Sequence, residues 1–120
     1  MKDRKEKILE IRIKEKKMEA SFTATRRLTK ENSFAIKQEL MQCATHRNCE
    51  LEINLSGILF IDNTVIDIFN LLSRMARRYD SRLFLSHVGG EVMEMINLIK
   101  KHSVFDIRVV IPEKEPMIAA

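Results

Sequence analysis

Apolar and polar residues alternate over several short segments of the chain, and this two-residue period is typical of strands with one buried face. Leu51–Leu55 (LEINL) alternates strictly, and Ile8–Ile13 (ILEIRI) alternates over most of its length. Met18–Ala24 is a less apolar strand candidate, joined to the preceding one by the charged turn Lys14–Lys17. The same criteria predict strands, or apolar chain buried under helices, at Ile58–Ile61, Arg82–Val88 and Phe105–Ile111.

Three other segments repeat their apolar residues every three or four positions, which predicts amphipathic helices. Thr29 is a good N-cap residue for the first helix. The second helix follows Asp62-Asn63-Thr64 and runs to about Tyr79, and the third is expected over Glu91–His102. The apolar stripe of the first helix consists of Ile36, Leu40, Cys43 and Ala44.

Strands that alternate with helices of this length predict βαβ units, and therefore an α/β domain with a mainly parallel sheet. A chain of 120 residues fits one domain. We expect its core to extend over about residues 8–111 and its termini, residues 1–7 and 112–120, to be flexible.

The composition excludes several classes of protein. No apolar run reaches the roughly 18 residues of a membrane span, and the charged N-terminus lacks the apolar region of a signal peptide. The two cysteines do not form a disulfide scaffold, so we expect a cytoplasmic protein. The net charge of +4 is concentrated in residues 1–17, where acidic residues are interleaved, as in a solvated segment.

Glu50–Ile107 resembles a STAS domain, and Met18–Leu40 resembles one more loosely. LEINL corresponds to the apolar strand of the family, and Ser56–Asp62 (SGILFID) to the segment that ends in an aspartate before a helix. RLFLSHV and Val104-Phe105 match later parts of the pattern. The resemblance implies a STAS-like α/β fold, with a mixed sheet of four or five strands and about three helices packed mainly on one face.

The resemblance also implies a regulatory, non-catalytic module that binds a protein partner. In the anti-sigma factor antagonists of this family, a kinase phosphorylates the serine after the aspartate, and the phosphate releases the kinase. Asn63 occupies that position here, Thr64 matches the second hydroxyl of the motif, and Val65 replaces its glycine. We therefore expect the partner surface to be kept and the usual phosphoacceptor to be lost, with Thr64 as the remaining candidate for phosphorylation.

The expected partner surface is the Asp62-Asn63-Thr64 junction and the polar side of the following helix. The first amides of a helix lack intrahelical partners, and the helix dipole adds positive partial charge there. Each junction residue can supply a capping oxygen, and Thr64 with Asp67 resembles a capping box. A purely structural capping role is the alternative. The residues assigned to partner binding are Asp62, Asn63, Thr64, Asp67, Asn70 and Arg74.

The expected partner is an anti-sigma kinase or another regulatory or scaffold protein. A constitutive structural subunit of a transporter or of a stressosome-like assembly is the alternative, and a homodimer is also compatible with the sequence. We expect no cofactor, no nucleic acid and no direct insertion into a membrane.

Three other groups of residues give weaker indications of a metal, phosphate or RNA site. Cys43, His46 and Cys49 are metal-ligand types at close spacing, but no fourth ligand lies nearby, so we expect metal-free thiols. Gly89-Gly90 precedes a helix without the lysine of a phosphate-binding loop. The arginines at 74, 77, 78 and 82 lack the aromatic interleaving of an RNA-binding surface. No catalytic constellation stands out, so we expect no enzyme.

Overall fold

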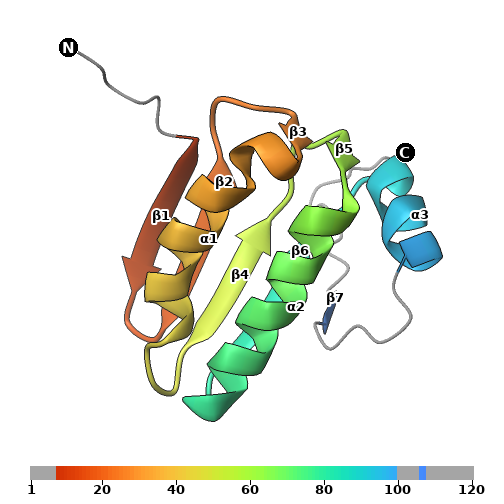
Figure 1. Cartoon of the computed structure of the whole chain (residues 1–120). Coiled ribbons are helices and arrows are strands. Elements are labelled where there is room, and N and C mark those ends of the chain that lie inside the picture. Colours follow the sequence, from red (N-terminus) through yellow and green to blue (C-terminus); the bar gives the residue numbers. More distant parts are fainter. Residues whose placement is uncertain (1–7, 100–105, 108–120) are drawn as a thin grey trace, which may run out of the picture.

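The chain folds into a mixed sheet with helices on one face and a second, two-stranded sheet at one end (Figure 1). The computed structural model describes residues 8–99 and 106–107. In chain order the elements are β1 (Leu9–Lys14), β2 (Lys17–Phe22), β3 (Arg27–Leu28), α1 (Lys30–Ala44), β4 (Glu50–Asn54), β5 (Phe60–Ile61), α2 (Asn63–Arg78), β6 (Arg82–Ser86), α3 (Gly90–Ile99) and β7 (Asp106–Ile107). The predicted α/β class is confirmed.

The larger sheet has the strand order β1-β2-β4-β6-β7. β1 is antiparallel to β2, and the other neighbouring strands are parallel. Side chains alternate between the faces of a strand, so residues matched in register point to the same side. The apolar residues matched under the helices are Met18, Leu51 and Leu83 in one row, and Ala20, Ile53 and Leu85 in the next.

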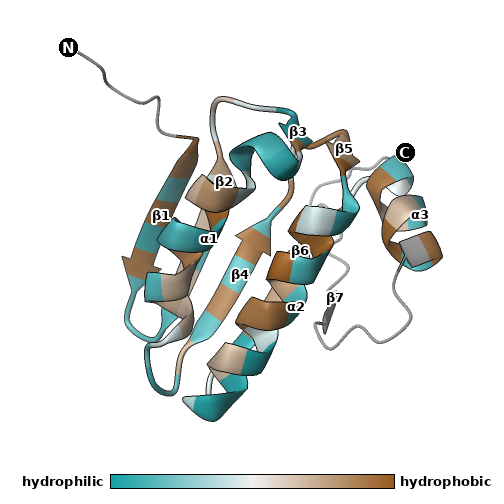
Figure 2. Cartoon of the chain, in the orientation of Figure 1, coloured by the Kyte–Doolittle hydropathy of each residue, from teal (hydrophilic) through white to brown (hydrophobic). Residues whose placement is uncertain are grey.

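Helices α1 and α2 lie across this apolar face, and Figure 2 shows hydrophobic and hydrophilic bands alternating along β1 and β4 beneath them. Ile36 and Leu40 of α1 and Phe69 of α2 are fully buried. Val92 and Ile96 of α3 join the same core. The predicted packing of the helices mainly on one face is confirmed, because both periodicities bury their apolar residues on the same side.

The structure corrects several predicted boundaries. β3 was not predicted, because two residues are too short to show a period. Within Ile58–Ile61 only Phe60 and Ile61 form a strand, and the side chain of Leu59 is exposed. β6 ends at Ser86, since His87 adopts a left-handed backbone conformation with a φ of 53°. The strand predicted over Phe105–Ile111 is described only at Asp106–Ile107, and the remainder, like His102 and both termini, lies outside the described residues.

Candidate functional site

Two strand-to-helix connections lie side by side at one end of the fold. β3 pairs in parallel with β5. Further hydrogen bonds extend this pairing, from Leu59 N to Arg26 O (2.8 Å) and from Asp62 N to Leu28 O (3.1 Å). Since α1 follows β3 and α2 follows β5, the two helix N-termini meet at the same edge (Figure 1).

A single carboxylate joins these two helix N-termini. Asp62 is the N-cap of α2, and its Oδ1 accepts a hydrogen bond from Val65 N at 3.1 Å. Its Oδ2 accepts from Lys30 N, the first residue of α1, at 2.8 Å. Both amides would lack a partner within their own helix, and both helix dipoles favour a negative charge at this position. Asp62 therefore stabilises both helix starts at once.

The first turn of α1 carries a second, local cap. Thr29 Oγ1 accepts from Glu31 N at 3.3 Å, and Asn32 Oδ1 accepts from Thr29 N at 2.8 Å, which completes a capping box. Asn32 Nδ2 also donates to Arg27 O at 2.9 Å and so holds the preceding strand. The predicted N-cap role of Thr29 is confirmed.

The predicted capping pair of Thr64 and Asp67 is wrong. The N-cap of α2 is Asp62, so Thr64 already lies in the first helical turn, and Asp67 lies beyond the position that a capping box needs. Thr64 is half-buried, and among the described residues its hydroxyl has no hydrogen-bond partner. The junction keeps one capping carboxylate and leaves the two residues after it without a capping role.

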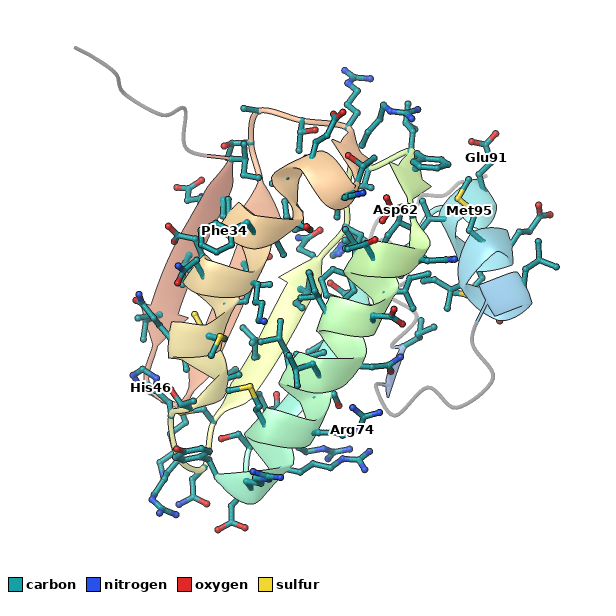
Figure 3. The ribbon with its side chains drawn as sticks, viewed as in Figure 1. Phe34, His46, Asp62, Arg74, Glu91 and Met95 are labelled. Atoms are coloured by element: carbon teal, nitrogen blue, oxygen red, sulfur yellow. The ribbon has the colours of Figure 1, made fainter. Side chains whose placement is uncertain are left out.

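The other predicted surface residues follow one face of α2. Asn63, Asp67, Asn70 and Arg74 are spaced by four, three and four positions, the spacing of a single helical face. Asn63, Asp67 and Arg74 are exposed, whereas Asn70 is half-buried. Arg74 lies toward the far end of α2, away from Asp62 at its start (Figure 3). Its Cα is about 16 Å from that of Asn63 along the helix, by the rise per residue. The structure thus groups the acidic and amide residues at the junction and places Arg74 away from them.

Side chains that were not assigned to the site from the sequence also lie at the junction: Arg27 and Lys30 from an earlier part of the chain, and Leu59 and Phe60 shortly before Asp62. Lys30 is exposed beside Asp62, and Leu59 exposes 53% of its surface. The guanidinium of Arg27 lies over the ring of Phe60, 4.4 Å from its centroid. Pairing of β3 with β5 brings Arg27 and Lys30 to the junction, and no local period could have revealed that pairing. Cations, a carboxylate and an exposed apolar side chain therefore occupy one small area.

A hollow of about 590 Å³ adjoins the paired connections. Gly57 turns the chain there with a φ of 83°, a conformation in which a side chain is strained. The hollow gives this end of the molecule a concave contour beside the helix starts. Its lining residues are Phe22, Thr23, Ala24, Thr25, Arg26, Ser56 and Gly57.

The sheet face opposite the helices is polar and holds a second cavity, of about 500 Å³. Asn54 Nδ2 donates to Glu19 Oε2 at 2.8 Å, and Ser86 Oγ donates to Glu52 Oε2. These carboxylates thus take part in hydrogen bonds between neighbouring strands. The cavity is lined by Arg12, Lys14, Lys17, Met18, Glu19, Glu50, Glu52, Phe84 and His87.

The predicted metal-ligand types near the end of α1 are engaged with backbone carbonyls. Cys43 is buried and its Sγ lies 3.8 Å from Glu39 O, while Cys49 Sγ donates to Arg47 O at 3.3 Å. His46 Nδ1 lies 2.9 Å from Gln42 O. Within residues 8–99 and 106–107, no three histidine, cysteine or acidic side chains are placed to hold a metal ion.

The two cysteines are expected to differ in reactivity toward alkylating agents. Burial, and to a lesser extent the nearby Glu39 carboxylate, raises the pKa of the Cys43 thiol, so less thiolate forms near neutral pH. Cys49 is half-buried and accessible. Iodoacetamide at pH 8 should modify Cys49 at least tenfold faster, with the sites resolved by peptide mass spectrometry. Equal rates in the native protein would contradict the burial of Cys43, and equal rates in denaturant serve as the control.

Comparison with known protein families decides the identity of this fold. The family model for the STAS domain matches residues 10–113. The chain belongs to the STAS family. STAS domains are typically non-catalytic. None of the curated proteins compared gives a significant match.

Solved structures share the STAS fold at low sequence identity. An anti-sigma-factor antagonist (STAS) domain protein from Planctomyces limnophilus superposes with a TM-score of 0.74 at 14% identity, over 84% of this chain and 88% of that one. A putative anti-sigma factor antagonist from Thermotoga maritima gives a TM-score of 0.66 at 13% identity, over 86% of each chain. Among the described residues, no helix has the length and apolar content needed to cross a bilayer.

Proposed function

We propose that this STAS domain is a regulatory module that binds a protein partner through the junction and the first turns of α2. The observation that carries the proposal is the double cap of Asp62, which fixes the starts of α1 and α2 relative to each other. Asn63, Asp67 and Lys30 remain exposed around this fixed point. A rigid frame that presents exposed polar side chains suits recognition, because little conformational freedom is lost on binding.

The class of partner that fits best is an anti-sigma kinase or a related regulatory or scaffold protein. The two solved structures named above are described as an anti-sigma-factor antagonist (STAS) domain protein and a putative anti-sigma factor antagonist. The exposed Leu59 and the hollow beside it offer an apolar contact within a polar rim, which is the usual anatomy of a protein interface.

Asn63 determines how this surface is regulated. It is the first residue of α2 and is exposed, at the position where the antagonists that the chain resembles carry a phosphorylated serine. An amide accepts no phosphate from a serine/threonine kinase, and the neighbouring Thr64 is half-buried. The wild-type protein therefore stays in its binding form.

The absence of a serine at position 63 also supports a second function, that of a constitutive structural subunit in a transporter or stressosome-like assembly. A junction without a phosphoacceptor is equally suited to an assembly that does not dissociate. Co-purification from native cell extract, followed by mass spectrometry, separates the two functions. A kinase in the complex supports the first, and a membrane ATPase or a large particle supports the second.

Asn63→Asp is expected to weaken partner binding by about 1–3 kcal/mol, because a second carboxylate beside Asp62 adds repulsion and a desolvation cost at the interface. Titration of the co-purified partner by calorimetry measures the change. Asn48→Asp is a matched control, since Asn48 is exposed in the loop before β4 and outside the junction. An unchanged affinity for Asn63→Asp would move the binding surface elsewhere.

A phosphorylation experiment tests whether the junction has lost its phosphoacceptor. With a kinase partner, Asn63→Ser should accept phosphate, while the wild type stays unmodified in intact-mass measurements. Stoichiometric phosphate on wild-type Thr64, lost in Thr64→Ala, would refute a permanently unmodified junction. A homodimer would need a different surface, since the partner occupies this one.

A further inference from the structure

The outer edge of β1 offers unpaired main-chain groups. Among the described residues, β1 pairs only with β2. Opposite residues of an antiparallel pair alternate between hydrogen-bonded and non-hydrogen-bonded positions, and Thr23 N donates to Ile8 O at 3.0 Å. Ile8, Glu10 and Arg12 therefore bond inward to β2. The amides and carbonyls of the residues between them, Leu9, Ile11 and Ile13, point away from the sheet.

The side chains of β1 divide into a charged row and an apolar row. Glu10 and Arg12 share the face opposite the helices, are well exposed and lie 3.9 Å apart at their charged atoms. Leu9, Ile11 and Ile13 point to the helix side, where Ile13 exposes 66% of its surface. This strand is regular over six residues and contains neither a proline nor a bulge that would disfavour pairing at its edge.

A further apolar side chain borders this edge. Phe34 of α1 exposes 71% of its surface, and Figure 3 shows it on the flank of α1 that lies toward β1. Ile13 is likewise exposed on the helix side of the sheet.

We propose that β1 pairs antiparallel with β1 of a second copy of this chain, with Ile11 of one copy opposite Ile11 of the other. The outward main-chain groups of Leu9, Ile11 and Ile13 then meet their counterparts and form about six hydrogen bonds. Leu9 lies opposite Ile13 on the apolar side. Glu10 lies opposite Arg12 on the charged side, and this pair occurs twice by symmetry.

Charge and the number of main-chain hydrogen bonds together favour this register over its neighbours. A shift of two residues in one direction places Glu10 opposite Glu10, and a shift in the other places Arg12 opposite Arg12. Like charges directly opposite each other destabilise a strand pair. A shift of one residue brings apolar side chains opposite charged ones and misaligns the main-chain groups. The shift that pairs Arg12 with Arg12 also pairs Glu10 with Lys14, but it keeps only two of the three outward residue pairs within the strand. The register centred on Ile11 places no like charges opposite each other and forms the most main-chain hydrogen bonds.

The pairing produces one continuous sheet across the two copies, with the two-fold axis perpendicular to the plane of the sheet. Helix α1 of each copy lies on the same side of that sheet, with Ile13 of both copies two residues from the dyad. The junctions at Asp62 point in opposite directions, so the dimer leaves both partner surfaces open. This inference concerns a surface separate from the one in the proposed function.

Sedimentation equilibrium of the full chain tests the pairing. The wild type should approach twice its 14.0 kDa mass as concentration rises. Arg12→Glu should raise the dissociation constant of the dimer about tenfold or more, because both cross-strand pairs become repulsive. Arg78→Glu, the same charge reversal at an exposed position at the end of α2, is the control and should leave the dimer unchanged.

A charge exchange separates pairing from folding. The double variant Glu10→Arg with Arg12→Glu restores opposite charges across the dyad and should recover the dimer that Arg12→Glu loses. Thermal melts establish that each variant is folded. A wild type that stays at 14.0 kDa at every concentration overturns the proposal. A dimer insensitive to Arg12→Glu overturns it as well, because that dimer uses another surface.

Discussion

Replacement of Leu55 by alanine is expected to lower the free energy of unfolding by about 2–5 kcal/mol. Leu55 exposes only 1% of its surface and belongs to the core beneath the helices. Its amide donates to Ser86 O at 2.9 Å, which fixes the chain directly after β4 against β6. The loss combines the transfer free energy of the deleted methyl groups with the cavity left behind. Denaturation in urea measures it.

Leu59→Ala is the matched control for this prediction. It deletes the same atoms four residues later, where the side chain exposes 53% of its surface. The expected loss is within about 0.5 kcal/mol, the range of ordinary surface substitutions. Similar losses for both variants would contradict the assignment of the buried face. Leu59→Ala should instead weaken partner binding, since Leu59 is the exposed apolar residue of the proposed interface.

Asp62→Ala is expected to cost about 2–3 kcal/mol of stability. The loss of an N-cap costs about 0.5–2 kcal/mol. The second hydrogen bond, from Lys30 N to Oδ2, also involves a charged acceptor, but Lys30 is exposed, so water replaces part of it. Urea denaturation gives the total, and far-ultraviolet circular dichroism reports whether helix content falls with it.

Two variants make the Asp62 prediction specific. Asp67→Ala removes an exposed carboxylate of the same helix that caps nothing, and should change stability by no more than about 0.5 kcal/mol. Asp62→Asn keeps a single acceptor oxygen and should fall between the wild type and Asp62→Ala. Equal stability for Asp62→Ala and Asp67→Ala would show that the carboxylate does not hold the two helix starts.

The long periodic segments of this fold were predictable, and the short ones were not. β4 alternates strictly and α2 has a continuous apolar stripe, so burial on one face determines both. β3 and β5 have two residues each, and only their pairing defines them as strands. The strand predicted over Arg82–Val88 was too long, because the hydrophobic pattern does not reveal the left-handed backbone conformation of His87.

The start of α2 at Asp62 was predicted, but the contacts of Asp62 with the rest of the fold were not. Asp62 stands after an apolar run and before a helix, so its role as a junction residue could be anticipated. Its bond to Lys30 joins residues 32 positions apart, and no local rule reveals such a contact. The capping box was assigned to Thr64 and Asp67 because their spacing fits, but Asp62 is the N-cap of α2. Asp, Asn and Thr have similar N-cap propensities, so only the backbone conformation decides which of the three neighbouring residues is the N-cap.

The Asp62 carboxylate, which is shared by α1 and α2, also affects local opening of the two helix starts. The first turns of helices usually fray independently, since each opens at small free-energy cost. Here the amides of Lys30 and Val65 are tethered to the same side chain, so fraying of one turn releases an anchor of the other. The two turns thereby form a single cooperative unit of local opening. If the proposed partner binds α2, we expect local opening at the start of α1 to decrease as well, because both amides share the Asp62 carboxylate.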